Sequence, residues 1–369
     1  MADDATRRSG GLQFSLLGMP VSVPLSGLLG VGLIAWLWAP TFGAGGTGLA
    51  AAVVFAVLLY AAILVHELAH GLTARGLGNA VHGITLWIFG GFTVYERANL
   101  TPGREAAIAA SGPLATLGVA AAAQGLLMTV GTSLPSVAAN ILSALVWTNI
   151  LLGVLNLLPG LPLDGGGIVR AVAWKLTGSE HRGTKVAAWS GRVLAVIVVV
   201  IPLGLAALPG SNLGLLTVVV AAVFGVFVWI GATASLRQST LEQRIPELRA
   251  GSLARRAVPA RTQESLALAR QRMADAHAGA IVVIDDFGHP TGVVNETAAS
   301  ATPPDRRPWI PVNSLSTPLP ARAMVRADVA GHDLIDALRQ ANAPAVIVVD
   351  ATGAIYGVLF IDDVEQALA

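Results

Sequence analysis

The sequence contains no cysteine and few charged residues. None of its 369 residues is Cys and only 12% are charged, whereas 54% are hydrophobic. The lack of cysteine excludes disulfides and thiolate ligands, so a metal site would have to use nitrogen and oxygen atoms. Soluble proteins have about a quarter of their residues charged. The low charge therefore indicates a membrane protein, at least in part, and the net charge of +1 argues against a nucleic-acid partner.

The few charges are distributed unevenly along the chain. Residues 1–250 hold 13 Lys and Arg and 9 Asp and Glu, whereas residues 251–369 hold 10 and 13. This change in charge density predicts a membrane domain followed by a soluble one. We expect a transmembrane domain over residues 1–236, a linker over 237–250, and a soluble domain over 251–369.

Six apolar runs are long enough, or nearly so, to cross a bilayer as helices. They lie at residues 23–39, 49–73, 105–130, 137–158, 186–208 and 213–236. In this six-span arrangement, all 13 Lys and Arg of the first 250 residues fall on one side. The positive-inside rule makes that side cytoplasmic. We therefore expect a multi-pass cell-membrane protein with both termini in the cytoplasm.

Two stretches show the patterns of β-hairpins. Residues 11–23 alternate apolar and polar side chains around Gly18. Residues 81–95 contain two runs rich in β-branched and aromatic side chains, separated by Gly90 and Gly91, which suit a two-residue turn. We expect small membrane-associated β-hairpins at both places, the second directly after the second span.

The soluble part contains an internal repeat of two α/β units. In each unit a helical segment leads to an apolar strand, at residues 280–285 and 345–350, and a glycine turn and a second strand follow. We place the repeats at about residues 251–300 and 316–367, joined by a proline-rich segment.

A pair of histidines follows an uncharged apolar segment. Residues 49–65 carry no charge, and His66, Glu67 and His70 then follow. Ionisable groups at membrane depth are costly and usually mark function. Side chains at i and i+4 share one helix face, so the two imidazoles can take two corners of a zinc site, with Glu67 as general base. The alternative is a polar patch that packs within a helix bundle.

A catalytic zinc site needs a third protein ligand and an open position for water. Asp164 is the best candidate, because prolines break the fourth span before it and the glycines after it allow unusual backbone dihedral angles. Irregular backbone at membrane depth is tolerated where it lines a cavity. Glu96 is the rival ligand, and a turn acid near the cytoplasmic surface is the alternative for Asp164.

This set of residues predicts metal-assisted peptide hydrolysis, in which Glu67 moves the proton. Asn156, within the fourth span, is suited to donate a hydrogen bond to the substrate or to the developing oxyanion, and an interhelical hydrogen bond is its alternative role. The hairpin at Gly90 and Gly91 is suited to hold an unwound substrate segment as an added strand.

These motifs resemble the site-2 protease family of intramembrane zinc metalloproteases. The resemblance covers about residues 11–236 and rests on His66-Glu67-x-x-His70, Asn156-x-x-Pro159, Leu163-Asp164-Gly165, the Gly90-Gly91 hairpin and Ser111-Gly112-Pro113. It implies one zinc ion per subunit, bound by His66, His70 and Asp164, with Glu67 as catalytic base. It also implies cleavage of single-span membrane-tethered regulators such as anti-sigma factors. The positive-inside rule predicts an active site toward the cytoplasmic side, because His66 and His70 lie toward the cytoplasmic end of the second span.

The soluble tail resembles a pair of CBS domains, which implies a dimerisation or regulatory unit. CBS modules that bind adenosine nucleotides often have a hydroxyl residue and then Asp after the last strand. Phe360 stands at the hydroxyl position here, although Asp363 remains, and Asn295 and Ala298 occupy the two positions in the first repeat. These departures predict weak or absent binding of adenine nucleotides.

Two other classes of function fit parts of the pattern. One is a membrane transporter or channel regulated by the CBS pair, with the histidines on an ion path. The other is a catalytically inactive scaffold that binds membrane proteins.

Overall fold

The computed structural model describes residues 11–97, 99–208, 211, 214–320 and 322–368. The chain divides into two compact units, Met1–Arg237 and Gln238–Ala369. Each unit has apolar clusters of its own, and each is described separately below.

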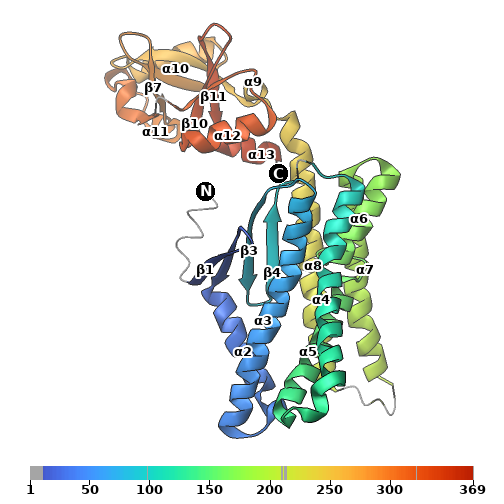
Figure 1. Ribbon diagram of the computed structural model, residues 1–369. Coiled ribbons are helices and arrows are strands. Elements are labelled where there is room, and N and C mark those ends of the chain that lie inside the picture. Colours follow the sequence, from blue (N-terminus) through green and yellow to red (C-terminus); the bar gives the residue numbers. More distant parts are fainter. Residues whose placement is uncertain (1–10, 98, 209–210, 212–213, 321, 369) are drawn as a thin grey trace. The chain divides into compact units, whose positions relative to one another are not determined.

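Within the described part of the first unit, six helices are long and apolar enough to cross a membrane. They are α2 (Leu25–Phe42), α3 (Gly45–Gly76), α4 (Pro102–Val130), α5 (Ser136–Asn156), α7 (Glu180–Ala206) and α8 (Leu215–Arg244), as Figure 1 shows. Their positions confirm the predicted polytopic helical fold. On α3, Ala51, Ala52 and Ala56 are buried, whereas Val53 and Val57 are exposed. Small side chains let the helices pack closely, and larger apolar ones are left to face lipid.

A shorter helix, α6 (Asp164–Thr177), was not expected from the sequence. The chain leaves α5 at Asn156, passes Pro159 and Pro162, and begins α6 at Asp164. Residues 165–167 are glycines with helical backbone, so the expectation of unusual dihedral angles there is wrong. They permit close packing instead: a Cβ on Gly165 would lie 2.3 Å from the carbonyl oxygens of Leu157 and Leu158.

The two predicted hairpins form one sheet. Its strands are β1 (Gly11–Leu16), β2 (Met19–Pro24), β3 (Val81–Trp87) and β4 (Gly90–Tyr95), in the order β1-β2-β3-β4. The hairpins join through parallel pairing of β2 with β3, where Val21 lies opposite Ile84. Both of these side chains are buried in a cluster that includes Tyr60 and Leu68 of α3, so the sheet packs on the helix that carries the histidine motif.

The turn of the second hairpin differs from the expectation. Trp87 pairs with Gly90, so Ile88 and Phe89 form the turn and the two glycines begin β4. Gly90 has a φ of +140°, which side chains rarely adopt. At position 91 glycine is needed for a steric reason, because a Cβ there would lie 2.6 Å from Glu67 Cγ.

The second unit contains the two predicted α/β repeats. The first comprises β5 (Arg255–Arg261), α10 (Leu266–Asp275), β6 (Ala280–Ile284), β7 (Pro290–Val294) and α11 (Glu296–Ala301); the second comprises β9 (Met324–Arg326), α12 (Gly331–Ala341), β10 (Ala345–Val349), β11 (Ile355–Phe360) and α13 (Ile361–Leu368). Together with β8 (Ser316–Pro318), the described strands form one sheet in the order β8-β7-β6-β5-β11-β10-β9. The shared order of elements confirms the predicted CBS-type pair.

The segment 237–250, expected to be a linker, is largely built into folded structure. Helix α8 continues to Arg244, and Arg249 forms a β-bridge with Ala330. Leu248 and Ala250 are buried in the core of the second unit. The sequence prediction is wrong here, because these two apolar side chains pack against residues that lie far ahead in the chain.

Candidate metal centre

The histidine motif lies on α3, where the helix is buried on several sides. His66 and His70 are less than 10% exposed, and their Nε2 atoms are 3.1 Å apart. The i and i+4 spacing brings the two rings together edge to face. Gly112 of α4 lies directly opposite, since a Cβ there would be 2.3 Å from His70 Nε2 and 2.7 Å from His66 Nε2. Only glycine lets α4 come this close to both imidazoles.

Hydrogen bonds to the other ring nitrogens determine the protonation of both imidazoles. His70 Nδ1 lies 2.7 Å from the carbonyl oxygen of Ile108, which can only accept, so Nδ1 carries the proton. His66 Nδ1 lies 2.8 Å from Thr116 Oγ1, whose own proton points to the carbonyl oxygen of Gly112. His66 Nδ1 is therefore also the donor. Both Nε2 atoms then present lone pairs to each other, an arrangement that favours a shared cation.

Asp164 completes the cluster from the first position of α6. Its Oδ2 lies 3.1 Å from His66 Nε2, and its Oδ1 lies 3.3 Å from His70 Nε2. Both carboxylate oxygens therefore face the ring nitrogens that the hydrogen bonds from α4 leave without a proton. The ligand atoms of the three residues all lie within 4.8 Å of one another. Two imidazoles and one carboxylate are a donor set that suits zinc, so these residues fit the ion.

The rival ligand Glu96 lies elsewhere. Its carboxylate is 3.7 Å from His82 Nε2, and both side chains are more than half exposed. Neither residue belongs to the metal-type cluster found among the described residues. The structure thus brings Asp164, and not Glu96, to the two histidines.

Glu67 points toward the hairpin. Thr93 Oγ1 of β4 lies 2.7 Å from Glu67 Oε2 and 3.0 Å from the Glu67 carbonyl oxygen. A hydroxyl has one proton, and the hydrogen bond to the charged oxygen is the stronger of the two. Thr93 therefore holds Oε2, which leaves Oε1 free to accept another donor.

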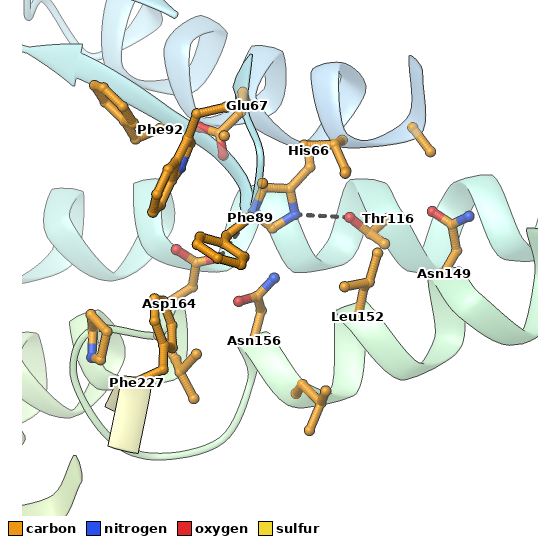
Figure 2. A pocket seen from close by; sticks show the side chains of 18 of the residues that line it. His66, Glu67, Phe89, Phe92, Thr116, Asn149, Leu152, Asn156, Asp164 and Phe227 are labelled. Carbon is orange, nitrogen blue, oxygen red and sulfur yellow. Dashed lines mark hydrogen bonds and ion pairs between the residues drawn. The ribbon is translucent and has the colours of Figure 1, made fainter. Parts of the chain in front are cut away.

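A cavity of about 390 Å³ opens beside this cluster. Figure 2 shows His66, Glu67 and Asp164 around it, with Phe89 from the hairpin turn and Asn156 from α5. The wall thus combines the three charged or metal-type side chains with apolar and amide groups. This composition suits a peptide segment whose side chains are mainly apolar.

Sequence reasoning found both predicted ligand histidines, Asp164, Glu67 and Asn156, and the structure places all of them at this site. It missed Asn149, which is buried seven residues before Asn156 on the same helix and also lines the cavity. The spacing of seven, two helical turns, was the available signal. It also missed Thr93 and Thr116, whose roles depend on contacts between distant segments.

Comparisons with known proteins identify the family of the chain. The model of peptidase family M50 matches residues 54–139 and 125–201. Rip3 of Mycobacterium tuberculosis, which is named as a zinc metalloprotease, is 31% identical over 317 residues that cover 85% of this chain and 79% of Rip3.

Two solved structures each resemble part of the chain. The site-2 protease from Methanocaldococcus jannaschii, at 24% identity, covers 61% of this chain and 95% of its own, with a TM-score of 0.45. The CBS domain of a bacterial CNNM/CorC family Mg²⁺ transporter, at 15% identity, covers 39% of this chain and 93% of its own, with a TM-score of 0.28.

The likeness to Rip3 extends over most of both chains. The chain therefore belongs to peptidase family M50, the site-2 protease family of membrane metalloproteases.

Proposed function

We propose that this protein is a zinc-dependent endopeptidase that cleaves single-span membrane proteins within or near their membrane segment. The observation that carries the proposal is the convergence of His66, His70 and Asp164 on one point, with Glu67 beside them on the wall of the same cavity. Each chain would hold one zinc ion through these three ligands. When bound, the ion polarises the scissile carbonyl and makes water more acidic.

Glu67 is the proton carrier in this mechanism. Its Oε1 accepts a proton from the attacking water and then delivers it to the nitrogen of the leaving amine. Thr93 holds Oε2 through its hydroxyl, so the carboxylate keeps one orientation throughout. The Asn156 amide, on the same cavity wall, donates a hydrogen bond to the substrate backbone or to the oxyanion.

The substrate segment would bind along β4. Among the described strands, β4 has a neighbour on one side only. Its free edge can pair with an unwound peptide as an added strand, which supplies hydrogen bonds that the peptide loses when its helix opens. Because Gly91 has no side chain, β4 runs close to Glu67 and would bring the added strand near the base.

The orientation of the protein in the membrane is also part of the proposal. His70 lies six residues before the end of α3 at Gly76, about 9 Å along the axis. Arg75, Arg97 and Arg104 follow His70 before or at the start of α4. Positive charge concentrates on the cytoplasmic side. The site would then lie toward the cytoplasm, and both termini would be cytoplasmic.

We expect the substrate to be a membrane-tethered regulator such as an anti-sigma factor.

The tail is a candidate surface for pairing with a second copy. In the tail, the Arg255 guanidinium lies 4.9 Å from the centre of the Phe360 ring and makes two hydrogen bonds, of 2.8 and 2.7 Å, to Asp363. These contacts support the prediction of weak or absent adenine nucleotide binding. Phe360 and Asp363 stand at the positions associated with nucleotide binding, and both already contact the guanidinium of Arg255.

The test is cleavage in reconstituted vesicles of a single-span protein labelled at both ends. Glu67→Gln should bind zinc as the wild type does and should release no fragment, because the amide cannot accept the proton. The matched control is Glu96→Gln, an exposed carboxylate away from the cluster, which should cleave normally. Cleavage by Glu67→Gln at the wild-type rate would contradict the mechanism. Zinc-dependent ion flux without cleavage would favour a transporter instead.

A further inference from the structure

A second group of ionised side chains lies near the metal centre, and the proposed hydrolysis does not use it. Glu105, near the start of α4, has a side chain that is only 2% exposed. Arg170 of α6 pairs with its Oε1, and Arg97, just after β4, lies 3.5 Å from its Oε2. Arg97 also pairs with Glu180 at the start of α7. The four formal charges cancel, and the buried carboxylate of Glu105 is compensated by its arginine partners, as a buried charge must be to be tolerated.

This charge cluster shares a cavity with the metal centre. The cavity, of about 260 Å³, is lined by Glu105 and Arg170 and also by Glu67, His70 and Asp164. Helix α6 connects the two groups, because it carries both Asp164 and Arg170. The two residues are six positions apart, about 9 Å along the helix axis. A displacement of α6 at Arg170 therefore moves the carboxylate of Asp164 as well.

Near the metal centre, α6 packs closely against its neighbours. The two histidines are braced by α4 through Ile108 and Thr116, whereas Asp164 faces the imidazoles themselves. The glycines after Asp164 allow close approach: a Cβ on Gly167 would lie 2.9 Å from the Cβ of Ala109. Contacts of this kind are not directional. A guanidinium paired with a carboxylate is directional, because its donors lie in one plane.

We propose that Glu105 and Arg170 are positioning residues, which hold α6 so that Asp164 reaches the two imidazoles. This inference rests on the proposed function, because it takes Asp164 as the third zinc ligand. Glu105 is well placed for the role, since it lies on α4, the same helix that orients both histidines. One helix thereby aligns all three ligands, two through hydrogen bonds and the third through an ion pair.

Zinc affinity of the full-length protein in detergent tests this inference without a substrate. Arg170→Met removes the contact with α6, and Glu105 keeps Arg97 as a partner. Competition with a fluorescent zinc chelator should show about 10- to 100-fold weaker binding, as for loss of an outer-shell partner. The matched control is Arg97→Met. Arg97 pairs with the same carboxylate as Arg170, but it does not lie on α6. Its zinc affinity should stay close to that of the wild type.

Thermal unfolding of the metal-free proteins separates positioning from a general loss of fold. If Arg170→Met does not fold, Arg170→Lys keeps the charge without the planar fork and should still bind zinc more weakly than the wild type. Equal zinc affinity in wild type and a folded Arg170 variant would overturn the positioning role. An equal loss in Arg97→Met and Arg170→Met would overturn it too, since the effect would then not pass through α6. A wild-type protein that binds no zinc would overturn the proposed function itself.

Discussion

The membrane unit and the second unit differ in how deeply their charged side chains are buried. In the membrane unit, Glu67 and Glu105 are 5% and 2% exposed and face other ionisable groups from distant segments. In the second unit the ion pairs are more exposed: Arg326 and Asp328, near neighbours in sequence, are more than 60% exposed, and Arg255, which pairs with the distant Asp363, is 42% exposed. Water screens a surface pair, so it contributes little, whereas a buried charge without its partner is costly. Substitution of a charged side chain should therefore have a large effect where that side chain is buried and contacts groups from distant segments, whatever the number of charges nearby.

Asp164→Ala should give the largest effect. The variant keeps two imidazoles, but the oxygen ligand from α6 is gone. We expect zinc affinity to fall by more than about 100-fold, because loss of an outer-shell partner alone costs 10- to 100-fold. Elemental analysis after dialysis against a weak chelator measures the metal content.

Glu96→Ala is the control for this experiment, because Glu96 lies at the surface beside His82. It should keep one zinc per chain and normal cleavage. Stoichiometric zinc in Asp164→Ala, with loss of the metal in Glu96→Ala, would show that the third ligand comes from the hairpin side and would contradict the assignment.

Gly91→Ala should give an intermediate effect, on catalysis and not on metal binding. The added Cβ would lie 2.6 Å from Glu67 Cγ and 3.0 Å from Oε1, so the carboxylate would have to move. A displacement of about 1 Å in a catalytic group can lower the rate about 100-fold. Single-turnover cleavage should therefore slow by roughly that factor, with zinc content unchanged.

Gly118→Ala provides the comparison for Gly91→Ala, since a Cβ at Gly118 meets nothing within 4 Å. It should cleave at the wild-type rate. Normal turnover by Gly91→Ala would mean that Glu67 tolerates the shift, and that β4 is not packed tightly against the base during the reaction.

The metal centre and the glycines packed around it also show what could be predicted from the sequence. His66, His70 and Glu67 were predictable because their relation depends on one helix, and helical spacing fixes it. Asp164 was found because chemistry required an acid and the broken span supplied one. Gly91 was predicted to lie in a turn and residues 165–167 to adopt unusual backbone dihedral angles, but in the structure these glycines permit close packing. A sequence cannot show this directly, because the reason lies in the side chain or carbonyl on the opposite segment.

The second unit was predictable for a different reason, namely that its repeats carry the same local signals. Asp285 Oδ1 accepts hydrogen bonds from the backbone nitrogens of Phe287 and His289, and Asp350 Oδ1 accepts the same pair of bonds from Thr352 and Ala354. An aspartate and a following glycine with positive φ define the turn in both repeats. The charge cluster around Glu105 has no such local signal, because its members come from segments that lie far apart in the chain.

Asp350→Ala should give the smallest effect, and one confined to its own turn. The hydroxyl of Thr352, followed by the backbone N–H groups of Thr352 and Ala354, lowers the pKa of Asp350 below its ordinary 3.8. Its contribution to stability is therefore fully present above pH 3.8 and is lost as pH falls through the lowered pKa. Hydrogen exchange of β10 and β11 in the full-length protein should show this acid-dependent loss of protection in the wild type but not in Asp350→Ala. At neutral pH the variant should show a slight loss of protection there, with zinc binding and cleavage unchanged.

Asp336→Ala, an exposed acid on α12 that lies 3.8 Å from Arg339, should leave the turn unaffected. A loss of zinc or of cleavage in Asp350→Ala would break the contrast between the units, because a surface carboxylate in the tail would then control the buried site.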